Sequence, residues 1–296
     1  MQTKKIKVQT PAKINLSLEI LDRMPNGFHT LSSVMQTVSL FDYITLEKTE
    51  ISGDAQILLS GTSDKIPYDE KNIVHKVIKS YFDELNIKGV KIQAHIEKNI
   101  PTEAGLAGGS TNAAGALIAI NELFDNELPM SKIHELASKA GSDLNFCLEG
   151  GACLLSSRGE IIDKKLPYKA FDLMIIKPKN IAVSTPMCYK NYSAKFFEKK
   201  LPYYSTKIVE LFEKDVFSVK ELAKYLYNDL EKPALEMHSQ IAMIKDDLIK
   251  AGAINSLMSG SGSSVFALIE SDIDYPKNLE QEIFRVSTTS KGCEII

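Results

Sequence analysis

The chain has 296 residues, of which 44% are hydrophobic and 25% are charged, as is typical of folded globular proteins. These values exclude a disordered chain, a collagen and a disulfide scaffold. The 35 Lys and Arg residues against 38 Asp and Glu leave a net charge of −3, so no basic excess favours nucleic-acid binding.

The cysteines are scattered, without C-x-x-C spacing, at Cys147, Cys153, Cys188 and Cys293. His134 and His238 have no metal-ligand partner nearby in the sequence, so neither a zinc ribbon nor a redox motif is predicted. Residues 1–10 contain no apolar signal-peptide core, and the longest apolar run, 113–120, is less than half a membrane span. We expect a cytoplasmic protein.

The first half of the chain alternates strand and helix patterns. Apolar and polar residues alternate over 14–20 and over 90–96, which predicts two strands. An amphipathic stripe over 73–85 predicts a helix between them, and a second helix is expected over about 110–124.

The second half has strand and helix patterns in separate groups. We expect a strand, a helix and two further strands at 171–176 (ended by Lys177 and Pro178), 237–251, 254–258 and 265–269. Residues 184–206 are rich in Tyr, Lys and Pro and lack periodicity, which indicates a surface segment. The grouping favours an α+β fold with two domains, 1–155 and 156–296.

A glycine-rich loop, residues 101–111 (Pro-Thr-Glu-Ala-Gly-Leu-Ala-Gly-Gly-Ser-Thr), lies between a predicted strand and a predicted helix. Glycines let successive backbone N–H groups converge, and a helix N-terminus adds partial positive charge, so the loop could bind a triphosphate. No Gly-Lys-Ser/Thr follows, so it is not a P-loop. Ser110, Thr111 or Asn112 could cap the helix that follows. A tight turn from strand to helix, with small residues for packing, explains the loop equally well.

Four further motifs favour phosphate binding over a tight packing turn as the function of this loop. They are Pro-Ala-Lys-Ile-Asn-Leu at 11–16, Asn-Gly-Phe-His-Thr-Leu at 26–31, Gly-Ser-Asp-Leu-Asn-Phe at 141–146 and Met-Ser-Gly-Ser-Gly-Ser-Ser at 258–264. With the glycine loop, they resemble the GHMP kinase superfamily over nearly the whole chain. The first two are most similar to its members that phosphorylate the 2-hydroxyl of a methylerythritol carrying cytidine diphosphate, in the non-mevalonate isoprenoid pathway.

The resemblance implies an N-terminal ATP-binding domain with a left-handed βαβ unit, a C-terminal ferredoxin-like domain, and an active site in the cleft between them. It also implies ATP as co-substrate and Mg²⁺. Asn72 matches a position beside the adenine. The residues expected around the ATP phosphates are Pro101, Thr102, Glu103, Ala104, Gly105, Leu106, Ala107, Gly108, Gly109, Ser110 and Thr111.

Lys13 and Asp143 match the catalytic pair of the family. Phosphoryl transfer asks for a carboxylate to accept the hydroxyl proton, which would be Asp143, and for a cation to stabilise the moving charge, which would be Lys13. The alternatives are a capping carboxylate and a solvated strand lysine. The period-two pattern puts Lys13 on the same face as Asn15, and either a cleft-facing or a solvent-facing lysine fits that pattern.

The resemblance also implies a substrate site. Phe28 and Tyr189 would lie on the two faces of the cytosine, and His29 would read its edge, with Thr185 nearby. Asn15 would reach the methylerythritol end. Ser110 is a weak candidate for a Mg²⁺ ligand, and no protein ligand is certain.

Three residues depart from the family pattern. Ala107 replaces a common glycine, and its Cβ disfavours positive φ. Asn145 replaces a common proline, which predicts a looser loop around Asp143, and Phe28 replaces the usual tyrosine. Rate and affinity, rather than activity itself, are in question at these positions.

Two other functions remain open. The chain could be a different GHMP kinase, of the homoserine or mevalonate type, or a non-catalytic ligand sensor on the same fold. Asn15, Phe28 and His29 favour the cytidyl substrate, and the presence of Asp143 and the intact loop disfavours a sensor. No nucleic acid, membrane or protein partner is implied.

Overall fold

The computed structural model describes residues 4–25, 27–276 and 280–296; Asn26 of the second motif lies outside them. The described strands and helices are, in chain order, β1 (Lys4–Arg23), β2 (His29–Glu50), β3 (Gln56–Gly61), α1 (Ile73–Leu85), β4 (Val90–Glu97), α2 (Gly108–Leu123), α3 (Met130–Ala140), α4 (Leu144–Glu149), β5 (Ala152–Ser156), β6 (Ile161–Leu166), β7 (Asp172–Pro178), α5 (Thr185–Lys195), α6 (Tyr204–Phe212), α7 (Val219–Ala223), β8 (Tyr227–Asn228), α8 (Glu231–Met237), α9 (Ser239–Lys250), β9 (Asn255–Met258), β10 (Val265–Ile269), β11 (Gln281–Ser287) and β12 (Glu294–Ile295).

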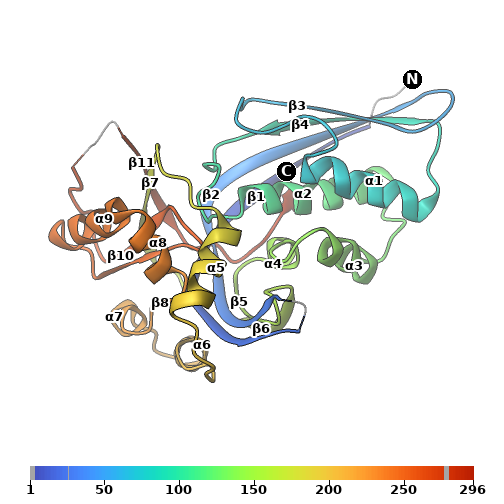
Figure 1. The fold of residues 1–296 in the computed structure, drawn as a ribbon. Helices are drawn as coiled ribbons and strands as arrows, with labels where there is room; N and C mark the ends of the chain where they lie inside the picture. Colours follow the sequence, from blue (N-terminus) through green and yellow to red (C-terminus); the bar gives the residue numbers. More distant parts are fainter. Residues whose placement is uncertain (1–3, 26, 277–279) are drawn as a thin grey trace.

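The long antiparallel pair of β1 and β2 forms the centre of the first sheet, whose main order is β12-β1-β2-β4-β3. β5 and β6 continue from β2, and β8 pairs with β1. β3 and β4 are parallel, with α1 between them in the chain. Helices α1 to α4 lie along one side of this sheet (Figure 1), where α1 and α2 share a hydrophobic core with β4.

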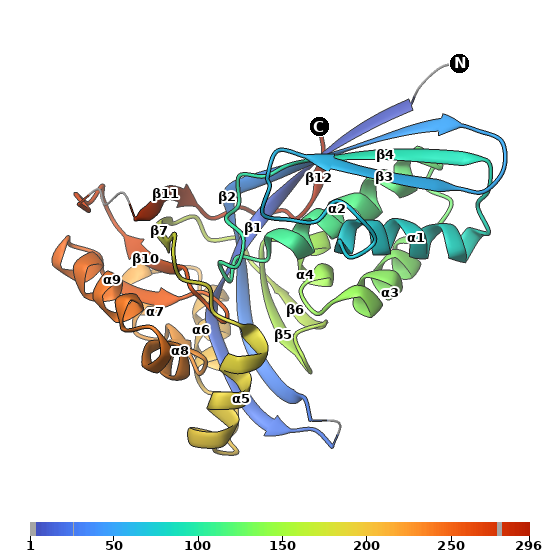
Figure 2. The ribbon, with the colours of Figure 1, turned by 45° about the horizontal axis from the view of Figure 1, so that its top comes forward.

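The second sheet is antiparallel, in the order β11-β7-β10-β9. Helices α8 and α9 lie beside it (Figure 2), and Ile241, Ile244 and Leu248 of α9 join its hydrophobic core. The other face shares a core with β1, in which Ile14 and Leu16 meet Phe266. The two sheets are therefore joined by buried apolar contacts through β1.

The first sheet receives strands from both ends of the chain. β6 and β8 follow residue 156 in the sequence, and β12 pairs with β1 at Val8 and Gln9. The proposed division into 1–155 and 156–296 stays a prediction. Within the described residues, none of the helices combines the length and apolar character needed to cross a bilayer.

The structure confirms the strands predicted at 90–96, 254–258 and 265–269, to within a residue at their ends, and the helix at 73–85. The strand predicted at 14–20 lies within β1, which is much longer and begins at Lys4. The other boundaries need correction. Residues 184–206 contain α5 and the start of α6, because aromatic contacts with other segments replace a regular apolar stripe. β7 continues through Lys177 and Pro178, and the helix predicted from Met237 is broken at His238 into α8 and α9.

Candidate active site

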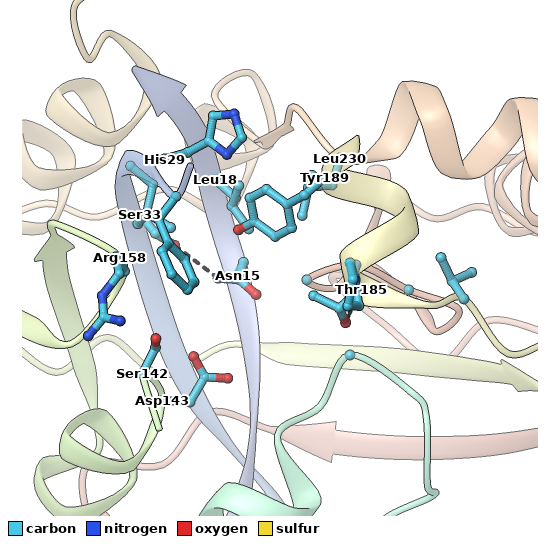
Figure 3. A pocket seen from close by; sticks show the side chains of 18 of the residues that line it. Asn15, Leu18, His29, Ser33, Ser142, Asp143, Arg158, Thr185, Tyr189 and Leu230 are labelled. Carbon is cyan, nitrogen blue, oxygen red and sulfur yellow. Dashed lines mark hydrogen bonds between the residues drawn. The ribbon is translucent and has the colours of Figure 1, made fainter. Parts of the chain in front are cut away.

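A cavity of about 1210 Å³ lies between the two halves of the chain. One wall comes from β1, the start of β2 and the residues around Asp143, and the other from the start of α5 and residues 260–262. Figure 3 shows Asn15 on β1 between these walls, with Asp143 and Ser142 on one side and Thr185 and Tyr189 on the other. The cavity thus brings together residues that are far apart in the sequence.

Lys13 and Asp143 meet at the floor of this cavity. Lys13 Nζ lies 3.9 Å from Asp143 Oδ2 and donates a hydrogen bond to Asn15 Oδ1 at 2.6 Å. Asn15 Nδ2 donates to Ser33 Oγ at 2.9 Å, and that hydroxyl donates to the Ser17 carbonyl at 2.6 Å. This network fixes the lysine, which is only 4% exposed and so is not the solvated residue that the pattern also allowed.

Asp143 occupies the N-cap position of α4, yet its side chain accepts no capping hydrogen bond. Its carboxyl group remains 29% exposed, on the cavity. A carboxylate that is partly accessible and lies beside a buried ammonium group can accept a proton from a bound hydroxyl. Asp143 is therefore at the capping position, as the alternative predicted, but its side chain does not cap the helix.

The glycine loop separates the large cavity from a second cavity of about 610 Å³. Glu103, Gly105 and Ala107 line both. Gly105 has φ +71°, and a Cβ there would lie 2.0 Å from the Ser259 carbonyl oxygen, so no side chain fits. Ser259 Oγ also donates to the Gly105 carbonyl at 2.9 Å. The Met-Ser-Gly-Ser segment thereby holds the loop in place.

The loop ends earlier than predicted, because α2 begins at Gly108. Its N-cap is Ala107, in the left-handed region at φ 57°, and no side chain caps the helix. A Cβ on Gly109 would have only Ile73 Cγ2 within 4.0 Å. Space is thus open around Gly109 in the first turn of this 16-residue helix, beside the second cavity, and the N–H groups of a first helical turn are a common binding site for phosphate.

The caps predicted at Ser110, Thr111 or Asn112 are therefore wrong. Thr111 is fully buried, with Oγ1 3.8 Å from Cys293 Sγ, and Asn112 Nδ2 donates to Asp42 Oδ2 at 3.0 Å. Ser110 is partly exposed on the first turn and is among the lining residues of neither cavity. With Ala107 as its N-cap, the helix begins two residues before the predicted start at about residue 110.

The remaining loop residues and Asn72 surround the second cavity, whose lining includes Pro101, Thr102, Glu103, Ala104, Gly105, Leu106, Ala107, Gly108 and Gly109. Asn72 is the N-cap of α1. Its Oδ1 accepts from Val74 N at 2.9 Å, and its Nδ2 donates to the Pro67 carbonyl at 2.6 Å. Asn72 therefore shapes this cavity by holding the turn before α1.

The four residues expected around the cytosine all line the large cavity. His29 stacks on Tyr189, with ring centroids 5.7 Å apart and planes at 26°, and its Nε2 lies 2.7 Å from Ser193 Oγ. Burial lowers the pKa of His29, and the Arg23 charge adds to this, so the neutral ring is favoured. Thr185 Oγ1 lies 2.7 Å from Ser261 Oγ. Phe28 is 54% exposed.

Asn145 corrects the expectation of a looser loop. Its Nδ2 donates to Ser138 Oγ at 2.7 Å and to the Glu160 carbonyl at 3.1 Å, and its Oδ1 lies 3.1 Å from His134 Nδ1. These contacts join α4, α3 and the turn between β5 and β6. The amide replaces the stiffness of a proline with long-range hydrogen bonds that no local pattern reveals.

Sequence reasoning missed two basic residues. Lys98 pairs with the buried Asp42 directly before the glycine loop and lines the second cavity. Arg158 lines the large cavity, with its guanidinium carbon 5.3 Å from the centre of the Phe28 ring. Lys98 lies three residues before the glycine loop, and this position could have identified it as a candidate phosphate-binding residue. Arg158 lies in a turn with no recognisable motif.

These features are those of a phosphotransferase, and the family comparisons agree. The model of the GHMP kinases N terminal domain matches residues 72–151, and that of the GHMP kinases C terminal domain matches residues 208–281. The chain has the two-domain GHMP kinase fold. The glycine loop lies within the residues matched by the N-terminal model.

Relatives narrow this class. The chain is 38% identical over 266 residues to 4-diphosphocytidyl-2-C-methyl-D-erythritol kinase of Clostridium perfringens, covering 90% of this chain and 89% of that one. The enzyme of the same name from Acaryochloris marina is 36% identical over 275 residues, covering 89% and 87%. The chain belongs to the 4-diphosphocytidyl-2-C-methyl-D-erythritol kinase family of GHMP kinases.

Solved structures agree on the fold. A crystal structure of 4-(cytidine 5'-diphospho)-2C-methyl-D-erythritol kinase matches with a TM-score of 0.74 at 25% identity, covering 97% of this chain and 99% of that one. Homoserine kinase from Cytophaga hutchinsonii matches with a TM-score of 0.75 at 20% identity, covering 99% and 97%. The second match shows the shared fold alone.

Proposed function

We propose that this kinase transfers the γ-phosphoryl group of ATP to the 2-hydroxyl of 4-diphosphocytidyl-2-C-methyl-D-erythritol, a step in making isoprenoid precursors. One observation carries the proposal: a single glycine loop lines both cavities, and Lys13 and Asp143 lie 3.9 Å apart in the larger one. ATP bound in the smaller cavity would present its terminal phosphate across the loop. The acceptor would fill the larger cavity.

In this reaction, Asp143 accepts the proton of the attacking hydroxyl. Lys13, held by Asn15, stabilises negative charge on the transferred group, because a fixed cation in a water-poor site costs no reorganisation during the reaction. Asn15 would also orient the methylerythritol end. Phe28, His29, Thr185 and Tyr189 would hold the cytosine, which places base recognition at one end of the cavity and chemistry at the other.

Mg²⁺, the metal that the family resemblance implies, would neutralise part of the negative charge of the phosphates. Among the described residues, there is no group of three or more His, Cys, Asp or Glu side chains that could hold a metal ion. The phosphates of ATP would therefore have to supply most of the ligands. Ser110 stays a candidate ligand. Glu103 is a second, because its carboxylate on a phosphate-binding loop would repel ATP unless a cation lay between them. A cytoplasmic location remains part of this proposal.

The test is an assay of ADP release from MgATP with four acceptors: 4-diphosphocytidyl-2-C-methyl-D-erythritol, mevalonate, homoserine and galactose. We expect turnover with the first, and a product heavier by one phosphoryl group in the mass spectrum. Asp143→Asn is the control for contaminating kinases. Equal turnover with homoserine or mevalonate would overturn the proposed substrate, and no turnover with any acceptor would favour the sensor.

A further inference from the structure

We propose that Arg158 binds the diphosphate of the acceptor substrate, with its guanidinium group held between Phe28 and the residues around Asp143. The proposal rests on the proposed function, because it names the residue that reads one part of that substrate. It starts from the position of Arg158, which lines the large cavity on the side that also carries Ser142 and Asp143, across from Tyr189 and Thr185 (Figure 3).

Arg158 links the two ends of the cavity. Its guanidinium carbon lies 5.3 Å from the centre of the Phe28 ring, a cation–π contact at the end assigned to the cytosine. The next residue, Gly159, lies near the proposed reaction centre, since a Cβ built there would lie 3.9 Å from Ser142 Cβ, and Ser142 directly precedes Asp143. In a cytidine diphosphate ester, the diphosphate also lies between the base and the sugar alcohol. Arg158 in the cavity and the diphosphate in the ligand therefore both lie between the cytosine end and the sugar-alcohol end.

The turn between β5 and β6 fixes the direction of this side chain. Glu160 Oε1 accepts from Arg158 Nε at 3.2 Å, and Oε2 accepts from the Arg158 backbone N–H at 2.8 Å. Burial alone would raise the pKa of Glu160, but hydrogen bonds from the backbone of Glu160 and Arg158, and from the Arg158 side chain, lower it. The carboxylate thus stays charged and occupies one edge of the guanidinium fork.

The other edge of the fork is available to a ligand. Over the described parts of the chain, the two terminal NH₂ groups of Arg158 have no hydrogen-bond partner, and the side chain is 37% exposed on the cavity. A planar fork with paired donors matches the oxygens of a phosphate better than an ammonium group does. Arg158 therefore has charge, shape and free donors for a diphosphate.

The other cations of the cavity fit this role less well. Lys13 is engaged by Asn15 and Asp143 in the reaction centre. Arg23 donates from Nη2 to the Ser193 carbonyl at 3.0 Å and covers the Phe197 ring at 5.4 Å, so one of its two terminal NH₂ groups is already in use. Lys190 lies on the exposed side of α5 and lacks the planar fork. Among the lining cations that the structure describes, Arg158 is the one whose guanidinium is held by a carboxylate while both of its terminal NH₂ groups stay unused.

The experiment measures how much affinity each phosphate adds. Cytidine, CMP and CDP are titrated by calorimetry into the full-length protein with the ATP site saturated by the non-hydrolysable analogue adenylyl imidodiphosphate and Mg²⁺. In the wild type, CDP should bind more tightly than cytidine. Arg158→Met should remove roughly ten- to a hundredfold of that gain, the value expected for hydrogen bonds to a charged group, while affinity for cytidine changes little.

Arg158→Lys keeps the charge without the fork and should give an intermediate loss. Arg23→Met is the matched control: it removes one charge from the same cavity and should change the gain by less than about threefold, because unspecific charge effects are screened by salt. A melting curve and the KM for ATP show whether each variant is folded.

If Arg158→Met keeps the full gain from cytidine to CDP, or if Arg23→Met loses as much, the proposal is overturned. The proposed function fails by a different result, the absence of turnover of the cytidyl acceptor by the wild type. A wild type that turns this acceptor over, together with an Arg158→Met variant of unchanged KM for it, would remove only the role of Arg158.

Discussion

The proposed reaction centre and the proposed cytosine site occupy the two ends of one cavity but are built differently. Lys13 and Asn15 lie on β1, are almost fully buried and are joined by a chain of hydrogen bonds to Ser33. At the other end, Phe28 is half-exposed beside a turn, and His29 depends on contacts with α5. The proposal thus assigns the chemistry to a buried strand and the adjoining start of α4, and substrate choice to more exposed segments.

This difference predicts which kinetic constant each region controls. A substitution in the reaction centre should lower kcat, because its interactions strengthen in the transition state. A substitution in the cytosine site should raise the KM for the cytidyl substrate and leave the KM for ATP unchanged. The predictions below test that division, beginning with the reaction centre.

The largest effect is expected at Asp143. Asp143→Asn removes the proton acceptor and keeps the shape, so kcat should fall about a hundredfold or more with ATP affinity nearly unchanged. Steady-state kinetics and a calorimetric titration with an ATP analogue measure the two quantities. A variant with near-native turnover would contradict the role of Asp143 as base.

Lys13→Met tests whether the pair acts as one unit. Its loss of kcat should be similar, and the double variant should lose far less than the sum of the two single effects in free energy. Asn15 Oδ1 would lose its donor, so a melting curve is needed for comparison. Additive losses would mean that Lys13 and Asp143 contribute independently.

The glycine loop offers a matched pair of variants. Gly109→Val meets open space in the protein, so it should weaken ATP binding about tenfold, equivalent to one hydrogen bond to a charged group, without lowering the melting temperature. Gly105→Ala would place its Cβ 2.0 Å from the Ser259 carbonyl oxygen and should lower both stability and affinity. Equal effects of the two variants on stability would favour packing, not phosphate binding, as the function of Gly109.

The residues of the proposed reaction centre could be found from the sequence because they lie in short local patterns. The alternation in β1 puts Lys13 and Asn15 on one face, and the glycine loop lies directly before a helix, so both could be found from short patterns. The start of α2 could not, because it depends on a left-handed alanine that propensity disfavours. The roles of Arg158 and Asn145 could not be predicted either, since their contacts are with residues in other elements or in turns.

A smaller effect is expected at Phe28. Phe28→Ala removes the stacking surface and should raise the KM for the cytidyl substrate roughly five- to a hundredfold, with the KM for ATP unaltered. Phe28→Tyr restores the residue usual in the family and should be nearly silent. If both KM values rise together, or if the melting temperature alone falls, Phe28 is a packing residue of the turn.

The pH dependence of the same site should be smaller still. Because burial lowers the pKa of His29 below its ordinary 6.5, the neutral ring persists through pH 7, and the KM for the cytidyl substrate should be constant above about pH 6.5. Below it, protonation should raise this KM about two- to tenfold, the value of one hydrogen bond. In this range the native state binds fewer protons than the unfolded chain. The free energy of unfolding should therefore decrease as the pH is lowered below about 6.5.

His29→Asn should remove the acidic rise in the KM for the cytidyl substrate, while the KM for ATP keeps its profile. Asn keeps a polar side chain but does not titrate in this range, so any remaining rise would come from another group. A rise that is unchanged in His29→Asn would contradict the assignment of His29 to the base edge.

The smallest effect is expected at Ala107, on the loop between the two cavities. At φ 57°, alanine is disfavoured by about 1–2 kcal/mol, and glycine would relieve this. Two effects oppose this gain. Glycine gives the unfolded chain more conformational freedom, which lowers the free energy of unfolding by about 0.5–1 kcal/mol. The substitution also removes the Ala107 methyl group, which packs beside the cluster around Phe146. Ala107→Gly should therefore raise the free energy of unfolding by less than about 1 kcal/mol and leave both KM values unchanged, as chemical denaturation and steady-state kinetics would show. Destabilisation by a similar amount would mean that the packing of this methyl group outweighs its backbone strain.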